Sequence, residues 1–195
     1  MISKLTLVSL VASATVASAT AQFTPPQSGA NVSIQWGGPS LRSEMLLADS
    51  FYVSNGSTLR GTIESLDGRD GNTLDVSDAA MGTKRTASLV TEFRLSTRRN
   101  FYSFEIQLRG RMSSYPGPVT VQWFDWQNNR WLNFDPCWFN TWLTNFGSEV
   151  IRGGWSTDKM VRGDGMVRIR VLRTQTLRNF WLCIDQAVLK VRYLL

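Results

Sequence analysis

The sequence predicts an all-β fold, a jelly-roll-like β-sandwich of two antiparallel sheets. Three observations lead to this class. Several short runs are rich in strand-forming residues, turn residues such as Gly, Asn and Ser separate them about every ten residues, and no run keeps the period of a long helix. The length of 195 residues suits one domain with a sizeable core.

The first residues, MISKLTLVSLVASATVASATA, have the pattern of a secretory signal peptide over residues 1–21. Lys4 precedes an apolar stretch, and Ala19 and Ala21 are the small residues that a signal peptidase recognises, so we expect cleavage after Ala21. The apolar stretch is interrupted by Ser and Thr and is too short for a membrane span, which argues against an uncleaved anchor. We therefore expect a secreted protein, extracellular or periplasmic, without a transmembrane segment after cleavage.

Residues 22–48 are expected to form an extended N-terminal arm that precedes a β-sandwich domain of residues 49–195. The arm begins with QFTPPQSGANVSIQWGG, and its Pro, Gly, Ser and Gln disfavour long regular elements. Within the arm we expect one short strand over residues 31–36 and a helical turn over residues 41–47.

The clearest strand pattern is FYSFEIQLRGRM, residues 101–112, in which Phe104, Ile106 and Leu108 share one face. Charged and amide side chains occupy the other face, which is the period-two alternation of a half-buried strand. VRIRV repeats the pattern with two arginines on the outer face, and Gln127-Asn128-Asn129 is a turn of hairpin length. The expected strands are residues 49–54, 59–63, 74–76, 85–95, 101–112, 119–126, 130–134, 167–171 and 181–193.

The two cysteines, Cys137 and Cys183, are predicted to form a disulfide, because an exported chain folds in an oxidising compartment. The closed loop would be long, and chain-entropy models then give about 4 kcal/mol of stabilisation. The alternative is two buried, unpaired thiols. A structural zinc site is not expected, since the chain has no histidine and too few cysteines for four ligands.

Five segments follow one another in a recognisable order: STLRGTIESLDGRDGNTLDV, SFEIQLRGRM, VTVQWFDWQNNRWLNF, MVRIRVLRT and WLCIDQAVLKV. In this order they resemble a family of uncharacterised secreted bacterial jelly-roll proteins, which are similar in build to carbohydrate-binding modules. The likeness covers most of the chain from about Phe51 onward. It implies a sandwich of two packed sheets and no particular activity.

Residues 119–139, VTVQWFDWQNNRWLNFDPCWF, hold four of the eight tryptophans, and apolar residues fall on both faces of this hairpin near its turn. One interpretation is that a second layer, such as residues 138–155, covers the rings, because large aromatic residues usually fill cores. The other is a platform on which the apolar faces of sugars stack. The ligand-binding residues would then be Trp123, Trp126, Trp131, Trp142 and Trp155.

The segment ESLDGRDGNTLD, residues 64–75, combines oxygen ligands with glycines that allow tight bends. A structural calcium held by Asp67, Asp70 and Asp75 is one hypothesis, although the spacing differs from that of an EF-hand loop. The alternative is a polar turn in which Asp and Asn bind their own backbone. No other cofactor is expected.

Charge patterning adds two further hypotheses. The formal charge of +6 is carried mostly by arginine, which pairs well with carboxylates, sulfates and phosphates. A basic face would suit an acidic polysaccharide or an envelope lipid, and a solvated outer sheet face is the alternative. Nucleic acid is not an expected partner, because the chain is exported and its charge is spread out. The arginines concerned are Arg98, Arg99, Arg109, Arg111, Arg168, Arg170, Arg173, Arg178 and Arg192.

Asp185 lies within the apolar strand segment WLCIDQAVLKV, where a carboxylate is costly unless it is paired. We expect its carboxylate to accept hydrogen bonds from the backbone or from an arginine. An acid or base in a pocket is the alternative role.

The absence of histidine excludes His-dependent catalytic triads and histidine metal sites. The leading functional hypothesis is a secreted, non-enzymatic binding module for a glycan or for an envelope or matrix component. The second is a structural or protein-interaction β-sandwich without a small ligand. The third is a glycoside-processing enzyme, which needs only two carboxylates, although no spacing in this chain selects a pair.

Overall fold

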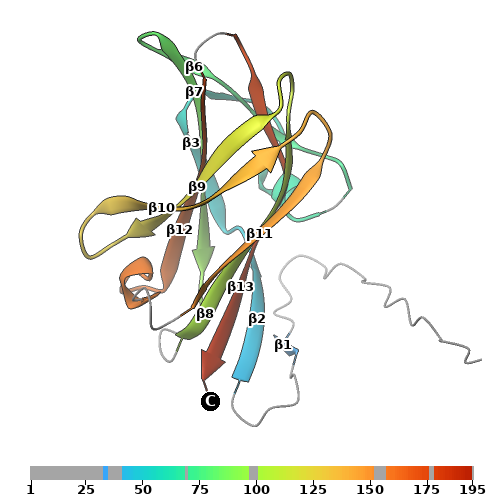
Figure 1. The fold of residues 1–195 in the computed structure, drawn as a ribbon. Coiled ribbons are helices and arrows are strands. Elements are labelled where there is room, and N and C mark those ends of the chain that lie inside the picture. Colours follow the sequence, from blue (N-terminus) through green and yellow to red (C-terminus); the bar gives the residue numbers. More distant parts are fainter. Residues whose placement is uncertain are drawn as a thin grey trace, which may run out of the picture.

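Two antiparallel sheets pack face to face in a computed structural model (Figure 1). The structure describes residues 33–34, 41–68, 70–96, 101–151, 157–175 and 178–194. The helices within these ranges are two short 3-10 segments, η1 (Ile63–Leu66) and η2 (Thr157–Met160). The predicted all-β sandwich of two antiparallel sheets is therefore confirmed.

The seven-stranded sheet is built around β13, the longest of the described strands. β13 pairs with β2 and β5 along one edge and with β8 along the other, and β11 closes the sheet beyond β8. Its strands are β1 (Ser33–Ile34), β2 (Leu41–Leu47), β4 (Ser57–Arg60), β5 (Leu74–Ser77), β8 (Phe101–Met112), β11 (Thr144–Ile151) and β13 (Trp181–Leu194).

The six-stranded sheet has the order β10-β9-β12-β7-β3, and β6 pairs with β7. β9 and β10 form a hairpin that projects at one edge of the molecule, next to η2 (Figure 1). The strands are β3 (Ser50–Asn55), β6 (Ala79–Met81), β7 (Lys84–Arg94), β9 (Gly117–Asp125), β10 (Arg130–Phe139) and β12 (Met166–Gln175).

The core lies between the two sheets, where alternating residues of each strand point inward. β8 contributes Phe104 and Leu108 from one sheet, and β12 contributes Ile169 from the other, as the alternation predicts. The Trp123 ring of β9 stacks against the Phe104 ring, with 6.0 Å between their centroids. Contacts of this kind between aromatic rings of opposite sheets hold the two layers together.

The predicted boundary between the arm and the domain is wrong at residues 41–47. Instead of a helical turn, this segment forms β2, which pairs with β13 from Leu41 opposite Leu194 to Leu47 opposite Val188. Leu46 is buried in the core, so this segment is part of the sandwich. β1 lies within the predicted 31–36 strand, whereas the predicted signal peptide and residues 22–32 lie outside the described residues.

The predicted Cys137–Cys183 disulfide is also wrong, since both cysteines are free and buried. Cys137 lies on β10 and belongs to the core between the sheets. On β13, Leu182 and Ile184 point into that core, so the intervening Cys183 faces the opposite side of its own sheet. The two thiols therefore lie on different sides of the seven-stranded sheet.

No helix within the described ranges is long and apolar enough to cross a membrane.

The placement of the cysteines predicts two inert thiols. Burial raises the pKa of both Cys137 and Cys183 to about 12, and Asp75 adds to the effect at Cys183. Without reductant, the folded protein should react with an alkylating reagent only slowly, and the denatured protein should take up two labels by intact mass. A denatured protein that takes up no label would show that the cysteines are bridged.

Candidate functional site

The outer face of the six-stranded sheet carries two adjacent rows of side chains that run across five strands. In the first row, Arg170 of β12 lies opposite Gln122 of β9, which in turn lies opposite Asn133 of β10. Arg170 donates from Nε to Gln122 Oε1 at 2.6 Å, and Gln122 donates from Nε2 to Asn133 Oδ1 at 2.5 Å. On the other side of Arg170, the row continues through Val90 of β7 to Tyr52 of β3.

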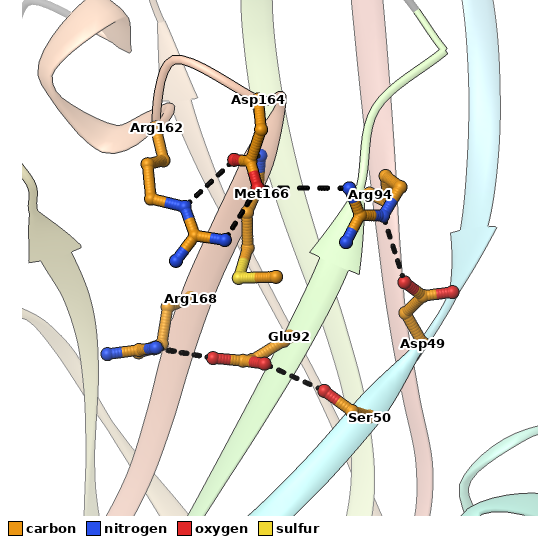
Figure 2. Close-up of polar contacts among 8 residues, drawn as sticks. All are labelled: Asp49, Ser50, Glu92, Arg94, Arg162, Asp164, Met166 and Arg168. Carbon is orange, nitrogen blue, oxygen red and sulfur yellow. Dashed lines mark hydrogen bonds and ion pairs between the residues drawn. The ribbon is translucent and has the colours of Figure 1, made fainter.

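The second row centres on an ion pair between Arg168 of β12 and Glu92 of β7 (Figure 2). Arg168 donates from Nε to Glu92 Oε1 at 2.8 Å, and the Ser50 hydroxyl donates to Glu92 Oε2 at 2.7 Å. The row is continued by Phe124 of β9 and Trp131 of β10, which lie opposite each other. Charged and aromatic groups thus meet in the middle of the sheet.

Three aromatic rings form one cluster at the edge of this face. Phe124 meets Trp126 and Trp131 edge to face, with centroid distances of 4.7 Å and 5.0 Å. Phe124 is buried beneath the other two rings, while Trp126 and Trp131 are half-buried. Both tryptophans therefore keep part of their surface open to solvent.

Arginines lie over these rings. The guanidinium carbon of Arg168 is 4.6 Å from the Trp126 ring centroid, and that of Arg170 is 4.1 Å from the Trp131 centroid. At such distances the cations are attracted by the negative faces of the rings, which restricts the rotamers of both partners. The face is therefore a preorganised set of flat rings and hydrogen-bond donors.

A pocket of about 390 Å³ adjoins Trp126 at the end of the sheet. The Trp126 backbone N–H donates to the carbonyl of Lys159 at 2.8 Å, which ties the end of β9 to η2. Arg162 lies over the Trp126 ring at 4.9 Å and pairs with Asp164. Figure 2 shows that Arg94 pairs with the same Asp164 and with Asp49. Arg162 and Arg94 are therefore balanced by two carboxylates.

The Glu92 carboxylate has an environment that favours its ionised form. Burial alone would raise its pKa, but the hydrogen bonds from Ser50 and Arg168 and the charge of Arg168 lower the pKa below its usual value. Glu92 is therefore a fixed anion that holds Arg168 in place. It is a poor proton donor near neutral pH, so it suits positioning better than general acid catalysis.

The structure separates the tryptophans that the sequence grouped together. Trp126 and Trp131 lie on the outer face, as a ligand platform requires. Trp123 is 0% exposed and cannot contact a ligand, so its assignment to a binding site is wrong. Trp142 is 65% exposed but lies in the β10–β11 turn, at the other end of the β9–β10 hairpin. Trp155 lies outside the described residues.

Sequence reasoning missed Tyr52, Glu92 and Asn133, which come from three other parts of the chain. Only the strand register brings them beside Arg168 and Arg170. The alternation around Gln122, which sets it on the same face as Phe124, was the one signal available for this polar row.

The predicted arginine surface is divided between two sides of the molecule. Arg168 and Arg170 lie on the outer face of the six-stranded sheet, whereas Arg109 and Arg192 pair with acidic residues of the seven-stranded sheet. Arg173 is buried and donates to the carbonyl of Pro118. Of the remaining arginines, Arg111 lies on β8 and Arg178 contacts Tyr115, whereas Arg98 and Arg99 lie outside the described residues.

Asp185 has the structural partners that the sequence predicted. Its carboxylate accepts a hydrogen bond from the Gly71 backbone N–H at 2.8 Å and pairs with Arg109 at 3.0 Å. Burial nevertheless raises the pKa of Asp185. This contact anchors the 61–73 loop to the last strand.

The carboxylates of the acidic loop are engaged with other groups. Asp75 pairs with Arg60 at 2.6 Å and accepts a hydrogen bond from the Thr73 hydroxyl, while Asp70 accepts one from the Asn72 backbone. Among the residues that the structure describes, no group of three or more His, Cys, Asp or Glu is close enough to hold a metal ion. A calcium ion held with Asp67 stays a prediction.

No family model and no curated protein matches the sequence. Solved structures similar to this chain include a complex of the carbohydrate-binding module TmCBM61 with beta-1,4-galactotriose, at 11% identity, a TM-score of 0.41, and coverage of 75% of this chain and 88% of that one. A family 29 carbohydrate-binding module from Piromyces equi is 14% identical, with a TM-score of 0.43 and coverage of 76% and 90%.

The ion pair at the centre of the second row predicts a pH-dependent contribution to stability. Because the folded state lowers the Glu92 pKa, the stabilisation is present above the unfolded value near 4.5 and is lost as the pH falls through the lower folded value. At pH 7, Glu92→Gln should reduce the free energy of unfolding by about 2 kcal/mol. Urea denaturation of both proteins between pH 3 and pH 7 measures this difference in the free energy of unfolding, which should become smaller as the pH falls.

Asp49→Asn is the matched control, since it removes a carboxylate from an exposed pair with Arg94 on the same face. Such a pair contributes at most about 1 kcal/mol. A Glu92→Gln variant as stable as the parent protein at every pH would contradict the structural role of Glu92.

A calcium site in the 64–75 loop predicts a higher melting temperature in excess calcium than in chelator, by a few degrees, because an ion that binds only the folded state stabilises it. Differential scanning calorimetry under the two conditions measures the shift. An unchanged melting temperature would remove the calcium hypothesis.

Proposed function

We propose that this chain is a secreted, non-enzymatic binding module and that the outer face of its six-stranded sheet binds a glycan. The observation that carries the proposal is the pairing of Trp126 and Trp131, both half-exposed, with the polar row of Arg170, Gln122 and Asn133 on the same face. A sugar offers an apolar ring face and a rim of hydroxyl groups, and this surface complements both. Ligand sites of this type combine apolar contact with a few fixed polar groups.

The preorganisation of the face supports binding further. Gln122 is held between Arg170 and Asn133, and Arg168 is held by Glu92, so a ligand does not have to order these side chains. Side chains that are already ordered reduce the entropy lost on association.

Binding is favoured over catalysis because the acidic side chains of this face are already paired. Glu92 pairs with Arg168, and Asp49 and Asp164 pair with Arg94. A two-carboxylate glycosidase needs one acid with a raised pKa, whereas the pKa values of Glu92 and Asp164 are lowered, the latter by the hydrogen bond from Arg162.

A second candidate function, a protein-interaction module, is favoured by exposed aromatic residues at one end of the sandwich. Trp138 and Trp142 are 60% and 65% exposed, and Tyr115 and Trp181 are exposed as well. The segments that carry them meet there, since the backbone N–H of Met112 donates to the carbonyl of Asn140 and that of Ser113 donates to the carbonyl of Trp181. Large exposed aromatic groups are common in protein interfaces.

Single tryptophan variants distinguish the two functions. Trp131→Ala and Trp126→Ala should each weaken the binding of a glycan by about tenfold, because each removes part of the stacking surface. Trp142→Ala is the matched control and should leave the affinity unchanged. Titration of a polysaccharide panel, followed by intrinsic tryptophan fluorescence and by affinity electrophoresis, measures these effects.

If Trp142→Ala alone weakened glycan binding, the site would lie at the opposite end of the hairpin and the proposed face would be wrong. Retention of no polysaccharide in the panel would favour the protein-interaction function. Release of reducing sugar that one carboxylate substitution abolishes would favour an enzyme.

A further inference from the structure

Arg170 differs from the other arginines of the outer face in having no acidic partner among the residues that the structure describes. Arg168 pairs with Glu92, Arg162 pairs with Asp164, and Arg94 pairs with Asp49 and Asp164. The hydrogen bond of Arg170 is donated by Nε to a neutral amide, that of Gln122. One positive charge at the centre of the face is therefore not balanced by a neighbouring carboxylate.

The Arg170 guanidinium is also fixed in position. Gln122 accepts its Nε–H group, and the Trp131 ring lies 4.1 Å from its central carbon. These two contacts occupy the Nε edge and one face of the planar group. Within the described residues neither Nη group donates a hydrogen bond to the protein, and Tyr52 is near enough to interact electrostatically with the guanidinium. A guanidinium that presents two parallel N–H groups binds a carboxylate or a sulfate in a bidentate manner.

Burial adds a third observation at the same site. Arg170 is half-buried, and the loss of solvent lowers the pKa of its guanidinium, although arginine stays protonated at physiological pH. Partial desolvation of a cation without a counter-ion is unfavourable in free energy, and an anion that binds beside the cation offsets part of that penalty.

We propose that the glycan bound by this face is anionic, and that Arg170 binds its carboxylate or sulfate group while the sugar ring contacts Trp131. This inference rests on the proposed function and specifies the class of its ligand. A uronic acid and a sulfated sugar share the oxyanion that Arg170 recognises. The overall formal charge of +6 favours the approach of such a polymer.

The test compares polymers that differ only in charge. Polygalacturonate is paired with its fully methyl-esterified form, alginate with its propylene glycol ester, and dextran sulfate with dextran. The full protein is titrated with each polymer at fixed ionic strength, and the affinity is measured by affinity electrophoresis and by calorimetry. In at least one pair the charged member should bind at least about tenfold more tightly. Preference within the first two pairs identifies a uronate, and preference within the third identifies a sulfate.

Arg170→Gln should abolish this preference, so that the charged and the neutral member of a pair bind with about the same affinity. Arg94→Gln is the matched control, because it removes one positive charge from the same face at a position that is already paired. The control should keep the preference. Arg170→Lys keeps the charge but not the bidentate geometry, so it should lose most of the preference. If the melting temperature shows that Arg170→Gln does not fold, Arg170→Lys replaces it in the test.

Several outcomes would overturn the inference. The wild-type protein could bind neutral glycans as tightly as their charged partners, which would leave the proposed function intact and remove the role of Arg170. Arg170→Gln and Arg94→Gln could reduce the preference equally, which would indicate attraction by overall charge rather than a site. Failure to bind any charged or neutral glycan would remove the proposed function, and this inference with it.

Discussion

The register of β12 between β7 and β9 is the constraint on which the rest of the structure depends. Ile169 points into the core between the sheets, and its burial fixes which side chains of β12 face outward. Arg168 and Arg170 must therefore lie on the outer face, one opposite Glu92 and the other opposite Gln122. A slip of one residue would bury both arginines and expose the apolar side of the strand, so core packing and the candidate site are coupled.

This coupling explains why the two rows of the outer face differ in charge. In the second row, Glu92 neutralises Arg168 and positions it over Trp126. In the first row, the residue opposite Arg170 on β7 is Val90, and Gln122 on β9 offers only a neutral amide. In this first row, the guanidinium of Arg170 also lies over the half-exposed Trp131 ring. The geometry thus sets a fixed cation beside a half-exposed aromatic ring, and the proposed preference for a charged sugar rests on that combination.

The aromatic residues of the β9–β10 hairpin are divided between the two faces of the sheet. Trp123 points inward and stacks on Phe104 across the core, whereas Trp126 and Trp131 point outward with Phe124 between them. The core interpretation is therefore confirmed for Trp123, whereas the platform interpretation stays a prediction for Trp126 and Trp131. Alternation along β9 separates them, because neighbouring residues of a strand face opposite sides.

The sequence by itself determined the class of fold and the faces of its most regular strands. Period-two alternation is a local property, so it can be recognised in one strand without knowing which strands pair with it. It could not show that residues 41–47 form a strand, because a seven-residue segment takes its conformation from β13, more than a hundred residues away in the chain. The same limit applied to the cysteines and to the site. Only the tertiary structure placed Cys137 and Cys183 on different sides of a sheet and brought Tyr52 and Asn133 into one row with Arg170, since strand pairing is a long-range contact that sequence spacing does not encode.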